Sequence, residues 1–189
     1  MKNRPTDICD CFLWQHQTFQ DERGIFLKVF QESLCKRLVT DKQNLRCGAA
    51  PDPFKEIFFS TSRKNVIRGM HFQIPPYDQE KCVFPVQGAI LDVLVDLRQG
   101  SPSYLKTIGV ELNVGESLWV AKGVAHGFLA KTDNAIVAYA VTSEYAPNHD
   151  CGILWNSFGF NWPVKKPIIS ARDLGHPLLK DFKTPFIYD

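Results

Sequence analysis

The chain has 189 residues, which is enough for one domain with a sizeable core. Its hydrophobic content of 44%, charged content of 22% and net charge of +2 are ordinary for a globular protein and exclude a strongly basic nucleic-acid surface. No apolar run approaches the length of a membrane span, and residues 1–7 lack the apolar core of a signal peptide, so we expect neither a nucleic acid nor a membrane as partner.

The first third of the chain predicts few regular elements. Residues 8–14 and 25–30 read as strands, with a turn at residues 21–24 between them. Residues 32–39 predict a short helix. Residues 40–53 are polar and contain two prolines, so they predict a surface loop.

The middle of the chain predicts a series of short strands separated by Gly, Asn and Asp. These strands are expected at residues 56–62, 66–73, 81–87, 89–98, 104–112, 117–120, 127–131 and 135–143. In the longest run, the even-numbered residues, including Asp92 and Asp96, share one face, and Leu91, Val93 and Val95 share the other. The acid-bearing face then either meets solvent or lines a polar cavity.

Short strands at this spacing predict a mainly β fold, a β-sandwich or barrel with a few short helices. Past residue 151 the pattern loosens, and Ser170 with Asp173 three residues later predicts a helix start. We find no internal repeat and no second domain, so residues 1–189 are expected to form a single domain.

The stretch Arg68–Gln73 combines a cation, a histidine and an amide. In a strand, Met70 and Phe72 would point one way and His71 and Gln73 the other. A lone histidine is more often a core residue satisfied by a hydrogen bond. The residues that accompany His71 further along the chain favour a chemical role instead.

The segment Gly115–His126 has the glycine and histidine spacing of the second motif of cupins, which are small β-barrels, with Ala121 where a proline is usual. In metal-binding cupins the first motif supplies a His-x-His pair and a glutamate. The matching positions here hold His71, Gln73 and Glu80. Glutamine is a poor transition-metal ligand, so we expect no metal. The six cysteines lack paired spacing and predict free thiols in the cytoplasm.

Without a metal, the chemistry must come from proton transfer. His71 is the natural base, because the unperturbed pKa of histidine lies near neutrality. Asp173, Asp92 and Asp96 are candidates for the carboxylate that would hold its other nitrogen, and spacing does not choose among them. Lys81 is able to stabilise a developing oxyanion, although a solvated surface lysine is the plainer reading.

Two tyrosines are candidate proton donors opposite a base. Tyr139 and Tyr145 are six residues apart and share a face if the strand is continuous. The alternative for each is packing in the core or at the rim with a satisfied hydroxyl. His16, His149 and His176 lie in polar or turn segments and receive no role.

Several motifs occur in the order found in one family. They are residues 21–24, Asn65–Gln73, Lys81, Leu91–Arg98 with Ser101 and Pro102, Gly123–Phe128 and Ser170–Asp173. On these motifs the chain resembles the dTDP-4-dehydrorhamnose 3,5-epimerase family of cupin-fold sugar-nucleotide epimerases. The resemblance covers residues 8–180 and implies a cupin-like jelly-roll barrel.

The resemblance also implies roles for individual residues. His71 would be the base, Asp173 the carboxylate behind it, Lys81 the group that stabilises the 4-oxygen, and Tyr139 the proton donor. Tyr145 would stack on the nucleobase. The candidate substrate-binding residues are Arg23, Phe26, Lys28, Glu56, Phe58, Arg68, Gln73, His126, Tyr145, Asp150 and Arg172.

The implied activity is inversion of C3, C5 or both in a nucleotide-diphosphate-linked 4-keto sugar, through an enolate and without a cofactor. Such a step serves deoxysugar or heptose biosynthesis for surface polysaccharide. The resemblance further implies a cytoplasmic homodimer in which an N-terminal strand reaches the partner subunit. The alternative is a barrel that binds sugar nucleotides without turning them over.

Two departures from the family pattern concern the nucleotide. Lys28 stands where a glutamate is usual, and Glu56 and Phe58 stand where a Gln-x-Asn pair is usual. A carboxylate accepts from the N–H groups of guanine or cytosine but donates nothing to the carbonyls of thymine. The sequence therefore predicts no strong preference for thymidine, unless Lys28 and Glu56 simply pair with each other at the rim.

Overall fold

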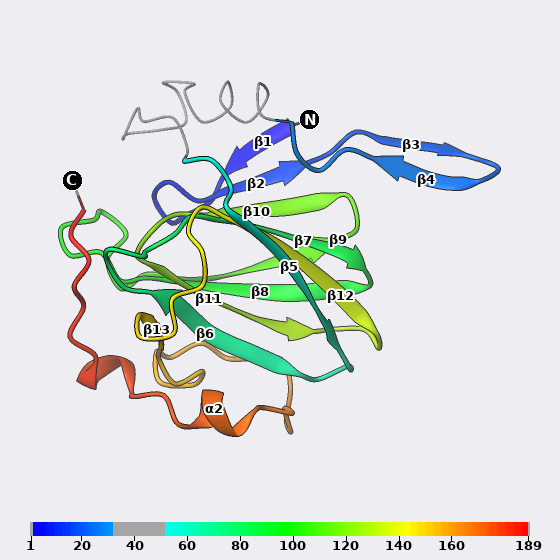
Figure 1. Cartoon of the computed structure of the whole chain (residues 1–189). Coiled ribbons are helices and arrows are strands. Elements are labelled where there is room, and N and C mark those ends of the chain that lie inside the picture. The colour runs from blue at the N-terminus through cyan, green and yellow to red at the C-terminus, as the bar shows by residue number, and fades with distance from the viewer. Residues whose placement is uncertain (1, 32–51, 189) are drawn as a thin grey trace.

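The computed structural model describes residues 2–31 and 52–188, which fold mainly as β-strands (Figure 1). The strands are β1 Lys2–Pro5, β2 Phe12–Gln15, β3 Thr18–Asp21, β4 Gly24–Leu27, β5 Glu56–Ser62, β6 Ile67–Gln73, β7 Lys81–Gln87, β8 Ala89–Asp96, β9 Thr107–Asn113, β10 Glu116–Val120, β11 Val124–Ala130, β12 Ala135–Val141 and β13 Asp150–Gly152. The helical segments are α2, Ala171–Leu174, and the 3₁₀ turn η1, Leu179–Asp181.

Two antiparallel sheets form the barrel. One has the strand order β1-β2-β10-β7-β12-β5 and the other β13-β6-β11-β8-β9, while β3 and β4 form a separate hairpin that projects from the body (Figure 1). Neighbours within each sheet come from distant parts of the chain, as in a jelly roll. The predicted mainly β, cupin-like fold is therefore confirmed.

The main core lies between the two sheets. Val83 and Val137 reach it from the six-stranded sheet, and Ile90, Leu94 and Phe128 reach it from the five-stranded sheet. Strand alternation sends every second side chain of each strand into this layer. Both faces of the five-stranded sheet are buried, which explains why every residue of β11 is buried.

A second core lies on the outer face of the five-stranded sheet. Met70, Phe72 and Val93 point outward there and pack against the C-terminal segment, from which Trp162 and Phe186 contribute. The predicted alternation of the Arg68–Gln73 stretch is thus confirmed, and His71 is directed to the opposite face. The C-terminal segment crosses this outer face and carries α2 to the barrel (Figure 1).

The N-terminal elements differ most from the prediction. The strand expected at residues 8–14 begins only at Phe12, because residues 8–11 form a turn in which Asp10 has a φ of 62°. The sequence does not predict β1 or β3. The first is a short polar edge strand that ends in proline, and the second is exposed at every residue, so neither shows alternation.

Several predicted boundaries shift by a few residues. The strand expected from residue 104 begins at Thr107, after turns through residues 101–106, and the strand expected to run to residue 143 ends at Val141. The helix start is confirmed, because Ser170 Oγ accepts the Asp173 N–H at 3.1 Å. The helix predicted at residues 32–39 lies outside the described residues.

The two aspartates of β8 are both fully buried, so the solvent-facing alternative for their face is wrong. Asp96 accepts hydrogen bonds from Arg98, Ser101 and Ser103 and fixes the turn after β8. Asp92 lies deeper and pairs with His126. A buried carboxylate requires such partners, since desolvation strongly disfavours an unpaired charge.

Strands β6 and β11 approach each other unusually closely at two glycines. Gly69 has a φ of +130°, and a Cβ on it would lie 2.5 Å from the Gly127 Cα. The ladder between these strands is irregular between His126 and Phe128, at this same point. Both glycines are therefore required for β6 to present His71 beside β11.

In the described part of the chain, no helix is long and apolar enough to cross a membrane.

Candidate active site

A cavity of about 330 Å³ opens between the two sheets. It is lined by Glu56, Phe58, Ser60, Arg68, His71, Phe72, Gln73, Gln79, Lys81, His126, Tyr139, Val141, Tyr145, Asp150 and Arg172. Most of the predicted site residues thus meet at one place, although they come from positions spread over more than a hundred residues of sequence.

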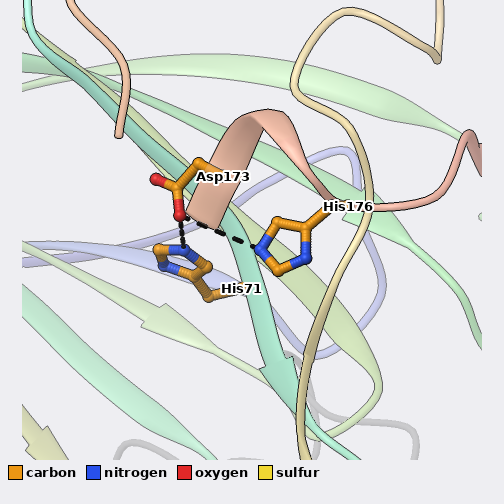
Figure 2. Close-up of side chains that lie close together, drawn as sticks. All are labelled: His71, Asp173 and His176. Atoms are coloured by element: carbon orange, nitrogen blue, oxygen red, sulfur yellow. Dashed lines mark hydrogen bonds and ion pairs between the residues drawn. The ribbon is translucent and has the colours of Figure 1, made fainter. Parts of the chain in front are cut away.

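His71 on β6 is held by a carboxylate from the C-terminal segment. Its Nε2 lies 2.8 Å from Asp173 Oδ1, and the other carboxylate oxygen accepts the Gly69 N–H at 3.1 Å (Figure 2). An ionised carboxylate only accepts, so Nε2 carries the proton and donates it to this bond. Nδ1 then carries the free lone pair of His71. Of the three aspartates that the sequence offered as partners of His71, the structure places Asp173 in that position.

Burial and charge set the protonation of this pair. Burial lowers the pKa of His71, against the raising effect of the neighbouring Asp173 carboxylate, and Lys81 lowers it further. Burial raises the pKa of Asp173, but hydrogen bonds from His71, Gly69 and Ser170 outweigh it and hold the value at about 2. At neutral pH the His71 imidazole is neutral and the Asp173 carboxylate is ionised. The imidazole is therefore a base that is able to accept a proton.

Lys81 is the buried cation of the cavity. The residue is 7% exposed, and Nζ donates to the backbone oxygen of His71 at 3.3 Å. Burial lowers the pKa of Lys81 to about 8, although the negative charges of Asp150 and Asp92 oppose this shift. The reading of Lys81 as a solvated surface residue is wrong, and the ammonium group is placed to face a developing negative charge.

Tyr139 lies on β12, in the sheet that faces the one carrying His71. Phe58 of the neighbouring strand stacks on its ring with centroids 4.8 Å apart and an interplanar angle of 16°. Burial raises the pKa of Tyr139, and the Asp92 charge adds to this, so the hydroxyl keeps its proton at neutral pH. A protonated hydroxyl therefore occupies the wall opposite the base.

His126 and Asp92 form a second acid–histidine pair in the cavity wall. His126 Nδ1 lies 2.9 Å from Asp92 Oδ1, and the imidazole and the Tyr139 ring are T-shaped to each other with a centroid distance of 5.7 Å. Burial raises the pKa of Asp92, and His126 counteracts the rise. Asp92 is therefore engaged by His126 and is not the partner of His71.

Polar residues at the rim hold one another in place. Arg172 donates to Asp150 at 2.6 Å, and Glu56 accepts the backbone N–H of Tyr145 at 2.8 Å. Tyr145 is 60% exposed and lies beyond the end of β12, so the continuous strand needed to align it with Tyr139 does not exist. It nevertheless lines the cavity.

Gln73 occupies the cavity wall with its amide fully engaged by backbone. Its Nε2 donates to the carbonyls of Tyr77 and Glu144, and its Oε1 accepts the Ala146 N–H at 2.6 Å. Its observed contacts fix the loops around the cavity. Arg68 likewise donates to Ser62 Oγ and to the Thr61 carbonyl while lining the cavity.

Asp173 does not line the cavity but contacts His71, whereas three other predicted residues lie outside the cavity of their own chain. Arg23, Phe26 and Lys28 belong to the projecting β3–β4 hairpin and the residue after it (Figure 1). All three are exposed, and Arg23 pairs with its neighbour Asp21. Within one chain, the structure does not bring them to the other site residues.

Ser60, Gln79 and His176 are site residues that the sequence reasoning missed. Ser60 follows the alternation of Glu56 and Phe58 on β5, which was a usable signal. Gln79 lies on a loop and gave none. His176 follows α2 and reaches the back of the His71–Asp173 pair, which only the folded chain reveals (Figure 2).

The comparisons with known proteins agree with this geometry. The family model described as dTDP-4-dehydrorhamnose 3,5-epimerase matches residues 5–181. The dTDP-4-dehydrorhamnose 3,5-epimerase of Escherichia coli is 38% identical over 173 residues, which cover 89% of each chain.

Two solved structures show the same architecture. The dTDP-4-dehydrorhamnose 3,5-epimerase of Bacillus anthracis, with TDP and PPi bound, has a TM-score of 0.85 and 36% identity, covering 94% of this chain and 99% of that one. The dTDP-6-deoxy-D-glucose-3,5-epimerase of Legionella pneumophila, in complex with dTDP-4-keto-L-rhamnose, has a TM-score of 0.89 and 29% identity, covering 100% and 98%.

The opposing charges around His71 predict opposite pKa shifts in two variants. In Asp173→Asn the anion that stabilises the imidazolium is lost, so the pKa of His71 should fall below its wild-type value. In Lys81→Met a cation that destabilises it is lost, so the pKa of His71 should rise. Titration of the histidine ring signals by NMR measures both. A shift of the same sign in the two variants would contradict the assigned contacts.

Proposed function

Because the chain belongs to the dTDP-4-dehydrorhamnose 3,5-epimerase family, we propose that its cavity inverts C3, C5 or both of a nucleotide-diphosphate-linked 4-keto sugar. The observation that carries the proposal is the placement of the His71–Asp173 pair and the Tyr139 hydroxyl on facing sheets. Inversion at a carbon requires removal of a proton on one side and delivery on the other, and these two groups supply the two sides.

The first half of the reaction is proton abstraction by His71. A 4-keto group acidifies the C–H bonds at C3 and C5, because the carbanion that results is delocalised onto the ketone oxygen. Nδ1 of His71 takes the proton while Nε2 keeps its bond to Asp173. The Asp173 charge then stabilises the imidazolium, which is the usual function of a carboxylate behind a base histidine.

The enolate oxygen needs a positive neighbour in a site shielded from water. Lys81 is that neighbour, since it is buried against the backbone of His71 and its pKa of about 8 leaves it mainly protonated at neutral pH. A well-placed cation or donor of this kind lowers the barrier by about 3 kcal/mol. No cofactor enters these steps.

The second half is delivery of a proton from the opposite wall. Tyr139 retains its proton because its pKa is raised, and the Phe58 ring stacked on it restricts its orientation. A protein that only binds sugar nucleotides would use the rim groups but would need neither this donor nor the buried base. The cavity therefore favours turnover over simple binding.

We propose that the enzyme is a homodimer in which the β3–β4 hairpin of each copy completes the other copy's cavity. Three aromatic or aliphatic side chains of the hairpin, Phe19, Ile25 and Phe26, are more than half exposed. Strand β5 is an edge strand beside the cavity, and its Ile57 and Phe59 are also largely exposed. Exposed apolar surfaces of this kind mark interaction sites, and an exposed edge strand favours pairing with another chain.

Such a dimer would bring Arg23, Phe26 and Lys28 to the nucleotide end of the neighbouring cavity. We further propose that the enzyme works in the cytoplasm, in deoxysugar or heptose biosynthesis for surface polysaccharide. Among the described residues, Cys9, Cys11 and Cys151 are free thiols, which fits a reducing compartment. The chain is also proposed to be a single domain over residues 1–189.

Deuterium incorporation separates the roles of the base and the donor. With a 4-keto sugar nucleotide in heavy water, His71→Ala should lose exchange at C3 and C5 by about 10²–10⁴-fold, as expected for loss of a general base. NMR of the sugar ring measures the exchange rate. Exchange at the wild-type rate in this variant would eliminate His71 as the base.

The matched variant for that experiment is Tyr139→Phe, which removes the hydroxyl and keeps the ring on Phe58. Proton abstraction should continue in this variant, while the yield of inverted product falls. An unchanged yield of inverted product would assign the donor role to another group.

Complementation tests the shared cavity. Arg23→Ala and His71→Ala should each be nearly inactive as pure homodimers. In a mixed dimer, the cavity of the Arg23→Ala copy keeps its own His71 and receives an intact Arg23 from the other copy. Co-expression with two different affinity tags and purification of the mixed dimer should therefore restore about half of the wild-type activity. Absence of any restored activity would show that Arg23 does not act across the interface.

Calorimetry with dTDP, GDP and CDP tests the prediction that thymidine is not strongly preferred, because it measures the dissociation constant of each nucleotide. One oxygen of Glu56 already accepts the Tyr145 N–H, so only the remaining acceptor capacity of this carboxylate is available to a base. We expect the three dissociation constants to lie within about tenfold, or about 1.4 kcal/mol, of one another. Binding of dTDP tighter than the other two by more than this factor would overturn the prediction.

A further inference from the structure

We propose that His176, Asp173 and His71 form an inhibitory binding site for a divalent transition-metal ion of the zinc type, behind the catalytic base. The inhibitory role rests on the proposed function of His71, whereas the metal site itself does not. In the described residues, this is the group of histidine and acidic side chains whose ligand atoms converge, all within 4.8 Å of one another (Figure 2).

The three ligand atoms are near the spacing that a tetrahedral ion requires. Asp173 Oδ1 lies 2.8 Å from His71 Nε2 and 3.8 Å from His176 Nε2. Zinc bonds of about 2.0–2.1 Å separate two tetrahedral ligands by about 3.3 Å, between the two observed distances. All three ligand atoms lie within 4.8 Å of one another, so the two rings would need to move toward the ion for it to replace the proton between His71 and Asp173.

His176 brings a buried nitrogen with no other use. Its Nε2 is buried and has no hydrogen-bond partner in the part of the chain that the structure describes. Its distance to the carboxylate is too long for a hydrogen bond. A buried ring nitrogen usually has a partner, so this one points to a missing ligand.

The backbone of β13 makes room for this histidine. A Cβ on Gly152 would lie 2.5 Å from His176 Nε2, so any larger residue would displace the ring. Gly152 is also the register partner of His71 across the β13–β6 ladder. The second histidine thus reaches the pair through a gap that glycine alone provides.

Asp173 is already oriented as a metal ligand. Its second oxygen accepts the Gly69 N–H, and its own N–H is capped by Ser170, so the carboxylate does not need to reorganise. Two imidazoles and one carboxylate are the ligand set of many zinc sites that leave a fourth position for water. Imidazole nitrogen also favours zinc, copper and nickel over magnesium or calcium.

The consequence for catalysis follows from the tautomer. A metal ion on Nε2 displaces the proton from that nitrogen, and a neutral imidazole then carries its proton on Nδ1. Nδ1 is the atom that accepts the substrate proton, so the metal-bound enzyme lacks its base. The ion would lie on the Asp173 side of the ring, so nucleotide binding at the rim would persist while proton exchange stops.

The test begins with tag-free enzyme stripped of metal by a chelator. We expect this enzyme to be fully active, to bind one Zn²⁺ per chain by calorimetry, and to lose deuterium exchange at least tenfold when zinc is saturating. Binding of dTDP should remain within about threefold of the metal-free value. Binding of Co²⁺ should give an absorption spectrum without thiolate charge-transfer bands.

Two histidine variants separate this site from adventitious binding. His176→Asn should weaken zinc binding by about 100-fold or more, because even outer-shell partners contribute about 10–100-fold. His149→Asn is the matched control, since the His149 ring packs at a tilt against Tyr77 and is not one of the three converging ligands, and it should bind zinc as the wild type does. Each variant's exchange rate is compared with and without zinc, so its own basal rate cancels.

Equal zinc affinity in His176→Asn and wild type, thiolate bands in the cobalt spectrum, or no binding at all would overturn the site. Zinc binding that depends on His176 but leaves exchange unchanged would overturn the inhibitory role. If the stripped enzyme shows no exchange with any 4-keto sugar nucleotide, the proposed function fails, and calorimetry with the two variants still decides the metal site.

Discussion

One partly buried hydrogen bond, from His71 Nε2 to Asp173 Oδ1, joins the candidate base on the barrel to the C-terminal segment that packs on its outer face. A carboxylate buried this deeply is stable only with strong partners, and Asp173 has the His71 ring and the Gly69 N–H. The same bond selects the ring tautomer and directs Nδ1 to the chemistry. This contact therefore contributes to both stability and reactivity, and the close approach of β6 and β11 positions it.

The cavity has an alternating arrangement of charge. The ionised Asp173 supports His71 from behind, buried Lys81 lies beside the base, and the buried Asp92–His126 pair meets the ring of Tyr139 from the sheet that carries His71. Each of these neighbours shifts a pKa in a direction suited to proton transfer. A neutral base, a protonated lysine and a protonated phenol are all present near neutral pH.

The sequence allowed much of the barrel and much of the cavity lining to be predicted. Alternation works where a strand separates two layers of different polarity, as on β6, where Met70 packs outward and His71 points to the cavity. It fails for β3, whose residues are exposed on both sides and carry no pattern. The choice of Asp173 came from the family motif, because spacing alone could not separate it from the two aspartates of β8.

Other features depended on contacts that sequence spacing does not encode. Gln73 is predicted as a substrate-binding residue and lines the cavity, and its amide also contacts three backbone groups that spacing does not indicate. His176 received no role, because its meeting with Asp173 depends on the course of the chain after α2 and on the gap at Gly152. The hairpin residues Arg23, which belongs to the motif at residues 21–24, and Phe26, a candidate substrate-binding residue, lie away from the cavity of their own chain.

The length of chain between the two partners of the central hydrogen bond has a consequence for synthesis on the ribosome. His71 and Asp173 are 102 positions apart, and the last strand of the barrel precedes α2. The sheets can therefore pair while the base still lacks its carboxylate, and Asp173 arrives only when the C-terminal segment emerges and packs onto the five-stranded sheet. A nascent chain that lacks α2 would hold an incomplete base, so the base is completed only after the strands of the barrel have been translated.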